Sequence, residues 1–231
     1  MLLGQQLASY SPSTHGNHWD TTLAAARACE QAGLDSVWLA DHFMFPDDKH
    51  PEKEVPVFDC FVVLGAIAAC TSSIRIGELV VGVPYRNPVL LAKMLTTLDV
   101  IAHGRTIVGL GAAWHEPEFR AYGWPFPSVR DRMEMLEEAV QIVDLVMTER
   151  PASFSGKHYT VDGAYNDPMP VLKPTHHDRW QWREGHPAAG GAVRGFLQRR
   201  RQSGRRPPQI RRAAPALRAC RQVARCGDPV E

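Results

Sequence analysis

Polar side chains with catalytic chemistry follow an apolar stretch early in the chain. The stretch DSVWLAD (35–41) is short and typical of a buried strand, and Asp41 and His42 stand where it meets a polar loop of about residues 43–56. A loop of that length in a compact domain is more often functional than accidental. His42, oriented by Asp41, could act as a donor or acid toward a cofactor. The alternative is that Asp41 caps the loop and His42 only packs.

A second strand pattern, IRIGELVVG (74–82), ends in similar surroundings. Gly77 and Gly82 allow a bulge or the close approach of a ligand. The segment PYRNP that follows predicts a rigid turn leading into a helix, with Asn87 just before the first helical proline. Arg86 within this turn carries a guanidinium that suits an anionic ligand, or a neighbouring aspartate.

The third strand pattern, RTIVGLGAA (105–113), contains Gly109 and Gly111. A Gly-x-Gly after a strand hints at dinucleotide binding, but the third glycine of that motif is missing. The glycines fit better as places where a flat ring lies against the backbone. A stacking face, a titratable ring and a carboxylate follow them: Trp114, His115 and Glu116.

Helical patterns alternate with these strands. Strands are expected at 2–9, 35–41, 74–82 and 105–113, and helices at 19–33, 58–70, 88–104 and 128–149. Four strands, each followed by a helix, predict parallel βαβ units. The two candidate architectures are a doubly wound sheet and a (β/α)8 barrel. A barrel needs roughly 250 residues, so this chain would be short of one. In both architectures ligands bind at the carboxyl ends of the strands.

Composition separates the body of the chain from its end. Residues 1–175 carry 13 Lys and Arg against 21 Asp and Glu, so nucleic acid is not an expected partner. Residues 176–231 carry 13 Arg, no Lys, four acids and only seven Ile, Leu, Val or Phe, which predicts an Arg-rich disordered tail. The N-terminus lacks the features of a signal or transmembrane segment, and five cysteines show no metal-ligand spacing. A cytoplasmic protein without a membrane partner or a metal is expected.

Four stretches of the chain resemble the bacterial luciferase-like superfamily, whose members use flavin mononucleotide (FMN) or the deazaflavin coenzyme F420. The matching stretches are AGLDSVWLADHF, YRNPVLLAKMLTTLDVIAHGR, GLGAAWHEPEFRAYGWPFP and FSGKHYTV. Among the superfamily, the chain looks most like the F420-dependent oxidoreductases. The resemblance implies a (β/α)8 TIM-type barrel, of which residues 1–174 would form about the first four βα units.

The same resemblance implies a site. A deazaflavin ring would lie over the strand ends and carry hydride to or from a small-molecule substrate. The expected catalytic residues are Asp41, His42, His115 and Glu116. The expected cofactor-binding residues are His42, Glu78, Leu79, Arg86, Asn87, Gly109, Gly111 and Trp114. A non-proline cis peptide is expected near Glu78–Leu79, beneath the ring. In some F420 relatives a glutamate follows the glycines, where this chain has Trp114, so His115 or Glu116 would supply the acid.

The tail from residue 175 departs from the family pattern, which has a glycine-rich phosphate-binding strand there. Trp180-Gln181-Trp182 must be encoded TGG-CAR-TGG, and reading one base later gives Gly-(Ser/Asn)-Gly. The neighbouring codons permit the composite PTTIGGSGAKVTL, which the family would place here. We therefore expect a frameshift near Pro174–His176, with residues 175–231 outside the homologous domain.

Two other functions remain open from the sequence. A non-catalytic, truncated fragment with a basic tail could act as an interaction module for nucleic acid or acidic partners. An NAD-dependent Rossmann enzyme would need the missing third glycine. For the luciferase-like interpretation, an incomplete barrel would leave strand edges open, so poor stability, aggregation or inactivity is expected. A homodimer is expected if the full barrel is present.

Overall fold

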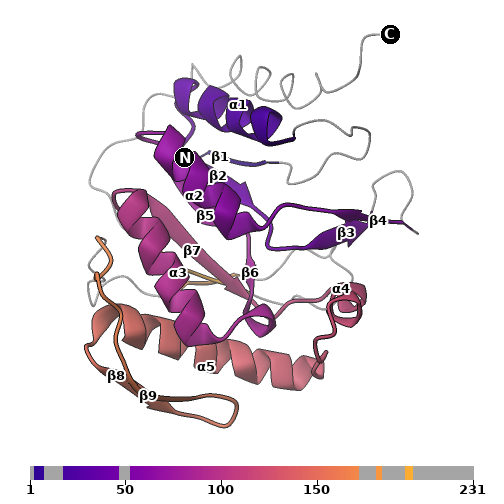
Figure 1. Cartoon of the computed structure of the whole chain (residues 1–231), viewed down its shortest axis with the longest axis vertical. Helices are drawn as coiled ribbons and strands as arrows, with labels where there is room; N and C mark the ends of the chain where they lie inside the picture. Colours follow the sequence, from indigo (N-terminus) through magenta and orange to yellow (C-terminus); the bar gives the residue numbers. More distant parts are fainter. Residues whose placement is uncertain (1–2, 8–17, 47–52, 172–180, 184–195, 200–231) are drawn as a thin grey trace. The chain divides into compact units, whose positions relative to one another are not determined.

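The computed structural model describes residues 3–7, 18–46, 53–171, 181–183 and 196–199 of the 231-residue chain (Figure 1). The described residues form two compact units that divide between Leu79 and Val80. Each unit has its own strands and helices.

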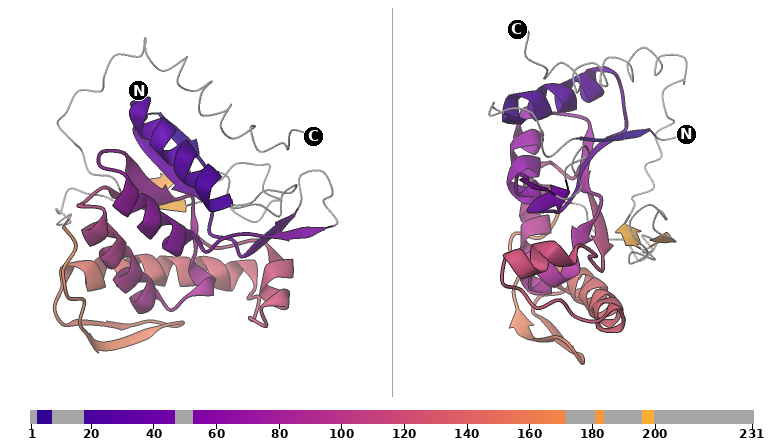
Figure 2. Two further views of the ribbon diagram at one scale, coloured as in Figure 1. Left: turned by 45° about the horizontal axis from the view of Figure 1, so that its top comes forward. Right: turned by 90° about the vertical axis from the view of Figure 1, so that its right-hand side faces the viewer.

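The first unit contains a parallel sheet covered by two helices. Its sheet strands are β1 (Gly4–Gln6), β2 (Ser36–Leu39) and β5 (Arg75–Glu78), and its helices are α1 (His18–Gln31) and α2 (Cys60–Cys70). β2 pairs in parallel with β1 on one side and with β5 on the other. Both helices lie on one face of this sheet (Figures 1 and 2).

Helix α2 shows how the sequence produces this packing. The side chain of Asp59 caps its first turn by accepting a hydrogen bond from the Val62 N–H at 3.0 Å. The helix is apolar on most faces, and Leu64 and Ile67 are fully buried. Burial of these side chains supplies the main stabilisation of a helix only 11 residues long.

The loop expected at about 43–56 has structure of its own. β3 (Met44–Pro46) and β4 (Glu54–Pro56) pair antiparallel, with Phe45 opposite Val55. Residues 47–52 between them lie outside the described part of the chain. Pairing satisfies backbone groups that an irregular loop would leave to water, so the segment extends from β2 as a hairpin.

The second unit begins with a short strand pair. β6 (Val81–Gly82) pairs in parallel with β7 (Thr106–Gly111), and a 3-10 turn, η1 (Val83–Tyr85), follows β6. The helices of the unit are α3 (Pro88–Ile101), α4 (Glu116–Ala121) and α5 (Val129–Thr148). α3 and α5 pack side by side, and both contact β7 (Figure 2).

A β-hairpin is attached to α5. Its strands, β8 (Ala152–Ser155) and β9 (Thr160–Ala164), run beside that helix (Figure 1). The carboxylate of Glu138 on α5 accepts hydrogen bonds from the backbone N–H groups of Lys157, His158 and Tyr159 at the hairpin turn. Burial alone would raise the pKa of Glu138, but these hydrogen bonds lower it.

Short strands also occur in the segment expected to be a disordered tail. β11 (Phe196–Arg199) pairs antiparallel with β7, and β10 (Gln181–Arg183) pairs with β11. For these seven residues the structure differs from the prediction, because the edge of β7 offers unpaired backbone groups that an added strand satisfies. The rest of the expected tail lies outside the described residues.

The alternation of strands and helices was predicted correctly. The expected helices at 19–33, 58–70, 88–104 and 128–149 correspond to α1, α2, α3 and α5, with ends that differ by at most three residues. The expected strand at 74–82 is divided into β5 and β6. Within the described residues, no helix combines the length and apolarity required to span a membrane.

One carboxylate connects α1 to the segment between α2 and β5. Oε1 of Glu30 accepts hydrogen bonds from the N–H groups of Ser72, Ser73 and Ile74 at 2.8, 2.6 and 3.0 Å. Burial would raise the pKa of Glu30, but the backbone hydrogen bonds and the hydroxyl of Ser73 outweigh burial and lower it to about 2.

Glu30→Ala is expected to lower the free energy of unfolding by about 1–2 kcal/mol at pH 7, after allowing for solvent screening. Because the folded-state pKa is depressed, this contribution is present above the unfolded pKa of about 4.3 and disappears as the pH falls toward 2. Urea unfolding of both proteins at pH 7 and pH 3 measures the effect. Glu137→Ala, at an exposed position of α5, is the matched control; equal losses in the two variants would contradict the assignment.

Candidate functional site

The carboxyl ends of β2 and β5 bring four of the predicted site residues to one edge of the first sheet. Leu39 pairs with Glu78, and the Leu79 N–H donates to the Leu39 carbonyl at 2.8 Å. Asp41 and His42 follow β2 directly. Parallel strands end at the same edge, so the two segments converge there as the sequence predicted.

Asp41 is 3% exposed and its Oδ1 accepts a hydrogen bond from the buried Cys60 thiol at 3.2 Å. Cys60 begins α2, so this contact fixes Asp41 against the helix. The His42 ring lies 4.9 Å from the Phe45 ring, between centroids, and the ring planes are inclined at 59°. The half-buried imidazole is therefore supported on one side by the hairpin strand β3.

Glu78 and Leu79 lie at the carboxyl end of β5, as predicted, but the peptide bond between them is not the cis bond that was expected. The cis peptides among the described residues precede Pro151 and Pro168, so the expectation of a cis bond at Glu78–Leu79 was wrong. The hydrogen bond from Leu79 to Leu39 extends the parallel pairing one residue beyond β5, which holds this backbone extended. The Glu78 side chain is fully buried.

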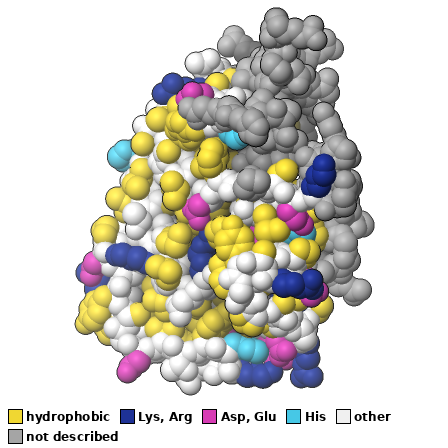
Figure 3. Space-filling model, turned by 45° about the vertical axis from the view of Figure 1, so that its right-hand side comes forward, with side chains coloured by type: hydrophobic (Ala, Val, Ile, Leu, Met, Phe, Trp, Pro, Cys, Tyr) yellow, Lys and Arg dark blue, Asp and Glu magenta, His cyan; other side chains and the backbone are white. Residues whose placement is uncertain are grey.

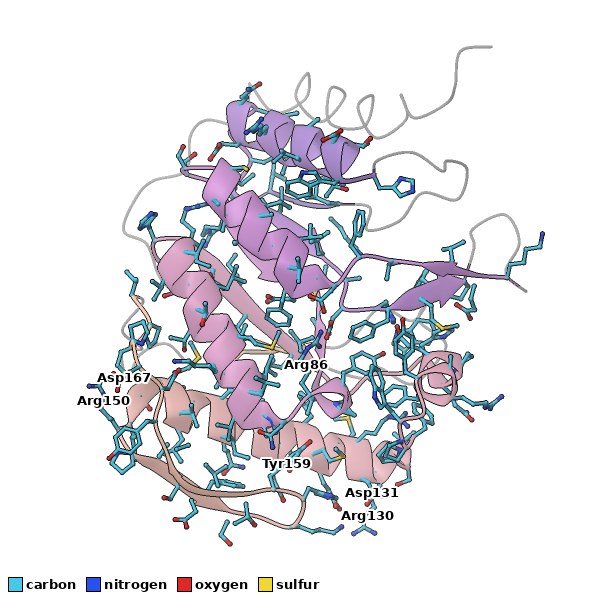
Figure 4. All side chains as sticks on the ribbon, viewed as in Figure 1. Arg86, Arg130, Asp131, Arg150, Tyr159 and Asp167 are labelled. Atoms are coloured by element: carbon cyan, nitrogen blue, oxygen red, sulfur yellow. The ribbon has the colours of Figure 1, made fainter. Side chains whose placement is uncertain are left out.

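A second edge, in the second unit, gathers the remaining predicted residues. Gly82 pairs with Gly111, so η1 and the segment after β7 leave from the same ends of the two strands. Arg86 follows η1 (Figure 4), and its N–H donates to the Val83 carbonyl at 3.4 Å. Asn87 caps α3 by accepting hydrogen bonds from the Val89 and Leu90 N–H groups at 2.9 and 3.4 Å. The Asn87 side chain therefore stabilises the N-terminus of α3.

The glycines at this edge are explained by close packing within the protein. A Cβ at Gly111 would lie 2.5 Å from Cγ2 of Val80, and one at Gly82 would lie 2.3 Å from the Tyr85 ring. Gly109 lies in β7, paired with Gln198 of β11. The space beside Gly111 is therefore filled by a side chain, whereas the sequence suggested a flat ring there.

Backbone strain marks the segment after β7. Ala113 has a φ of +57°, a left-handed conformation that costs a non-glycine residue about 1–2 kcal/mol. Such strain concentrates at ligand-binding sites. The turn at Ala113 leads to His115, which is 5% exposed and whose ring lies 5.0 Å from that of Trp114. Glu116 forms an exposed ion pair with Arg120 at 2.9 Å, so its carboxylate is already engaged.

Sequence reasoning missed Glu118. Its side chain is fully buried, and the Tyr85 hydroxyl donates a hydrogen bond to its Oε2. In the sequence, the stretch HEPEF places Glu118 next to the apolar Phe119. In the structure both side chains are fully buried, whereas Glu116 is exposed. Strand-end reasoning stops at Glu116 and does not reach the inner face of α4.

Aromatic rings surround the Tyr85–Glu118 pair. The Tyr85 ring lies 4.8 Å from Phe119 and 5.5 Å from Trp124, and Phe119 lies 4.9 Å from Phe126. The guanidinium of the buried Arg132 lies 4.1 Å over Phe126. Burial lowers the pKa of Arg132, and the charge of Glu116 opposes that shift.

A second group of titratable side chains anchors the hairpin. Asp131, Glu134 and His158 place potential metal-ligand atoms within 4.8 Å of one another. Lys157 already occupies this group, with its Nζ 2.5 Å from Glu134 and 3.8 Å from Asp131. Side chains of both charges gather at the bottom of the face in Figure 3, and Figure 4 labels Arg130 and Asp131 in the first turn of α5. Hydrogen bonds from Lys157, His158 and Arg130 lower the pKa of Glu134 to about 2.

The two edges offer different chemistry. The β2–β5 edge presents an imidazole beside a fixed carboxylate, which can donate a hydrogen bond or move a proton. The β6–β7 edge presents a guanidinium after η1 and an indole and an imidazole after β7, which can bind negative charge and stack on a planar group.

Ala113→Gly is expected to raise the free energy of unfolding by about 0.5–1 kcal/mol. Glycine adopts positive φ without strain, and this gain outweighs the loss of stability that comes from the greater entropy of glycine in the unfolded chain. The neighbouring change Ala112→Gly, at a buried position without positive φ, is expected to lower it. Urea denaturation midpoints of the two variants measure the difference. Equal destabilisation by both changes would show that Ala113 is not strained.

Comparison with known proteins places these residues in a family context. A sequence model of the family described as luciferase-like monooxygenase matches residues 1–230. An F420-dependent glucose-6-phosphate dehydrogenase of Kineococcus radiotolerans is 35% identical over 136 residues, which are 58% of this chain and 39% of the relative. An uncharacterized protein of Mycobacterium tuberculosis is 31% identical over 163 residues, covering 65% of this chain and 57% of the relative.

Solved structures agree in fold. An F420-dependent secondary alcohol dehydrogenase in complex with an F420-acetone adduct matches with a TM-score of 0.62 and 26% identity over 73% of this chain and 49% of that one. The F420-dependent tetrahydromethanopterin reductase of Methanopyrus kandleri matches with a TM-score of 0.58 and 20% identity over 74% and 47%. These neighbours are TIM barrels, so the predicted barrel type is confirmed, and the chain spans about half of their length. The chain belongs to the luciferase-like monooxygenase family.

Proposed function

We propose that this chain carries the ring-facing part of an F420-dependent oxidoreductase, which transfers hydride between the deazaflavin and a small-molecule substrate. The observation that carries the proposal is the repeated similarity to F420-dependent glucose-6-phosphate dehydrogenases, at 35%, 31% and 33% identity. Because the chain spans less than half the length of these three relatives, their substrate is not carried over.

The residues present suit a flat, polar cofactor. A deazaflavin combines a planar ring, which stacks on aromatic side chains, with anionic groups, which bind guanidinium. Trp114 and Arg86 supply those two chemistries at one edge of the second unit. His42 and the buried Asp41 supply hydrogen-bonding groups at the β2–β5 edge.

The bound cofactor would accept or supply the hydride at its C5 position. The chain's own residues then have separate tasks in this proposal. His42, supported by Phe45, donates a hydrogen bond or a proton to the cofactor or the substrate. Asp41, held by the Cys60 thiol, stays fixed beside it. His115 or Glu116 would supply the acid at the second edge; His115 is buried beside Trp114, and Glu116 is exposed.

The alternative cofactor is FMN. Flavin and deazaflavin have the same ring shape, and the structural neighbours include an FMN complex of a Baeyer-Villiger monooxygenase. The position of the ring that accepts hydride is carbon in F420 and nitrogen in FMN, so a side chain that hydrogen-bonds there favours FMN. Parallel titrations with both compounds distinguish them.

The full-length chain is expected to quench or shift the fluorescence of added F420, and His42→Asn is expected to weaken binding or reduce hydride transfer by about tenfold, the effect of one lost hydrogen bond. His103→Asn is the matched control. His103 has a φ of +51° at the end of α3, a conformation that asparagine tolerates.

Equal effects of the two substitutions would contradict a role for His42. Binding of NADH in place of F420 and FMN would favour a Rossmann enzyme. Absence of binding to all three, with a salt-dependent shift of nucleic acid that requires residues 176–231, would favour the interaction module.

We further propose that residues 175–231, which the match to the family model still includes, arise from a frameshift near Pro174–His176. The support is the shifted reading of Trp180–Trp182 as Gly-(Ser/Asn)-Gly, together with the Arg-only basicity of the tail. Sequencing the gene across the codons for Pro170 to Arg183 tests this. One displaced base, with a downstream frame that reads GGSG, is expected. An unchanged sequence in genomic DNA and transcript, with protein ending in the printed tail, would refute a sequencing error and leave only a natural frameshift.

A further inference from the structure

The half-buried Tyr85 and the fully buried Glu118 connect two segments that carry candidate ligand-binding residues. Tyr85 ends η1 and is followed directly by Arg86, while Glu118 lies in α4, shortly after Trp114 and His115. The hydrogen bond from the Tyr85 hydroxyl to Glu118 joins residues 33 positions apart in the sequence. Both partners belong to the second unit.

The backbone of Glu118 extends the connection to His115. Its N–H donates to the His115 carbonyl at 3.2 Å, and its own carbonyl accepts from the Tyr122 N–H at 3.0 Å. Glu118 is therefore held at its carboxylate by Tyr85 and at its backbone by the segment that carries the candidate ring-binding residues. A shift of Tyr85 would be transmitted to His115 through two hydrogen bonds.

Packing keeps Tyr85 in one place. Its ring lies over Gly82, where an added Cβ would come within 2.3 Å of it. The other neighbours are Phe119, fully buried, and Trp124, with ring centroids at 4.8 and 5.5 Å. Removal of the hydroxyl alone should leave this packing intact, because phenylalanine fills the same volume.

We propose that Tyr85 and Glu118 are positioning residues, whose partly buried hydrogen bond fixes the turn of Arg86 relative to the segment of Trp114 and His115. The hydrogen bond links the turn of Arg86, which can bind negative charge, to the segment of Trp114 and His115, which can stack on a planar ring. It therefore sets the distance between the two groups that one anionic, ring-bearing ligand would contact. This inference deepens the proposed function. The cofactor titration that tests it rests on that function, whereas the hydrogen-exchange measurement does not.

A simpler role would be general stabilisation of the second unit. Two observations favour positioning. The pair joins η1, which follows β6 directly, to α4, which follows the segment after β7, and Tyr85 is adjacent in sequence to Arg86. The aromatic cluster that surrounds the pair already supplies apolar burial, so the hydroxyl adds direction more than hydrophobic stabilisation.

The test is amide hydrogen exchange of the full-length chain, followed by mass spectrometry, in the wild type and in Tyr85→Phe. We expect exchange in residues 112–121 and 85–90 to rise about tenfold, as expected for loss of a hydrogen bond to a carboxylate, with no change in the β8–β9 hairpin. Tyr165→Phe, at a tyrosine 67% exposed, is the matched control. Unchanged exchange, or an increase spread over the whole unit, would overturn the proposal.

A second readout separates positioning from stability. In titrations with F420 and with FMN, Tyr85→Phe should raise the dissociation constant of whichever cofactor binds by about tenfold. Glu118→Gln, whose amide oxygen still accepts the tyrosine hydroxyl, should retain more affinity than Glu118→Ala. Local loosening with unchanged affinity would refute the positioning role.

The two proposals fail separately. If the wild type binds neither cofactor, the proposed function fails, and hydrogen exchange alone decides whether the pair fixes the two segments. If Tyr85→Phe does not fold, Glu118→Gln and Glu118→Ala are compared by the same exchange measurement. Equal exchange in those two variants would then overturn the inference.

Discussion

The pairing of parallel strands is the constraint on which the candidate site depends. Leu39 opposite Glu78 in the first unit, and Gly82 opposite Gly111 in the second, decide which polar residues leave the strands at a shared edge. A register shift of one residue would turn each side chain to the opposite face of its sheet. Asp41 and His42, or Trp114 and His115, reach their edges only because β2 and β7 end where they do.

Hydrogen bonds to buried carboxylates then fix the segments after the strands. Cys60 holds Asp41 in the first unit, and Tyr85 holds Glu118 in the second. The first contact joins the segment after β2 to the start of α2, and the second joins the end of η1 to α4. Each contact therefore connects residues that are close in space but distant in the sequence. Irregular backbone gains little order from its own residues, which is why such segments depend on contacts of this kind.

Long periodic helices and short apolar strands could be predicted from the sequence, whereas the polar strands of the β3–β4 hairpin could not. The apolar spacing of α5 and the proline and glycine that bracket α3 specify those helices locally. The β3–β4 hairpin, with its prolines and charges, has the composition of a loop. Its two strands form because their backbones pair with each other. The burial of Glu118 was equally hidden, because it depends on where Tyr85 lies. The expected cis bond at Glu78–Leu79 came from family resemblance and failed for this backbone.

The central claim is that a planar cofactor binds at the carboxyl ends of the parallel strands. Amide hydrogen exchange of the full-length chain with and without F420 maps that surface directly. Protection is expected at the strand ends of the second unit, in residues 83–87 after β6 and residues 112–118 after β7. Protection confined to the β8–β9 hairpin, or bound F420 that protects none of these segments, would contradict it.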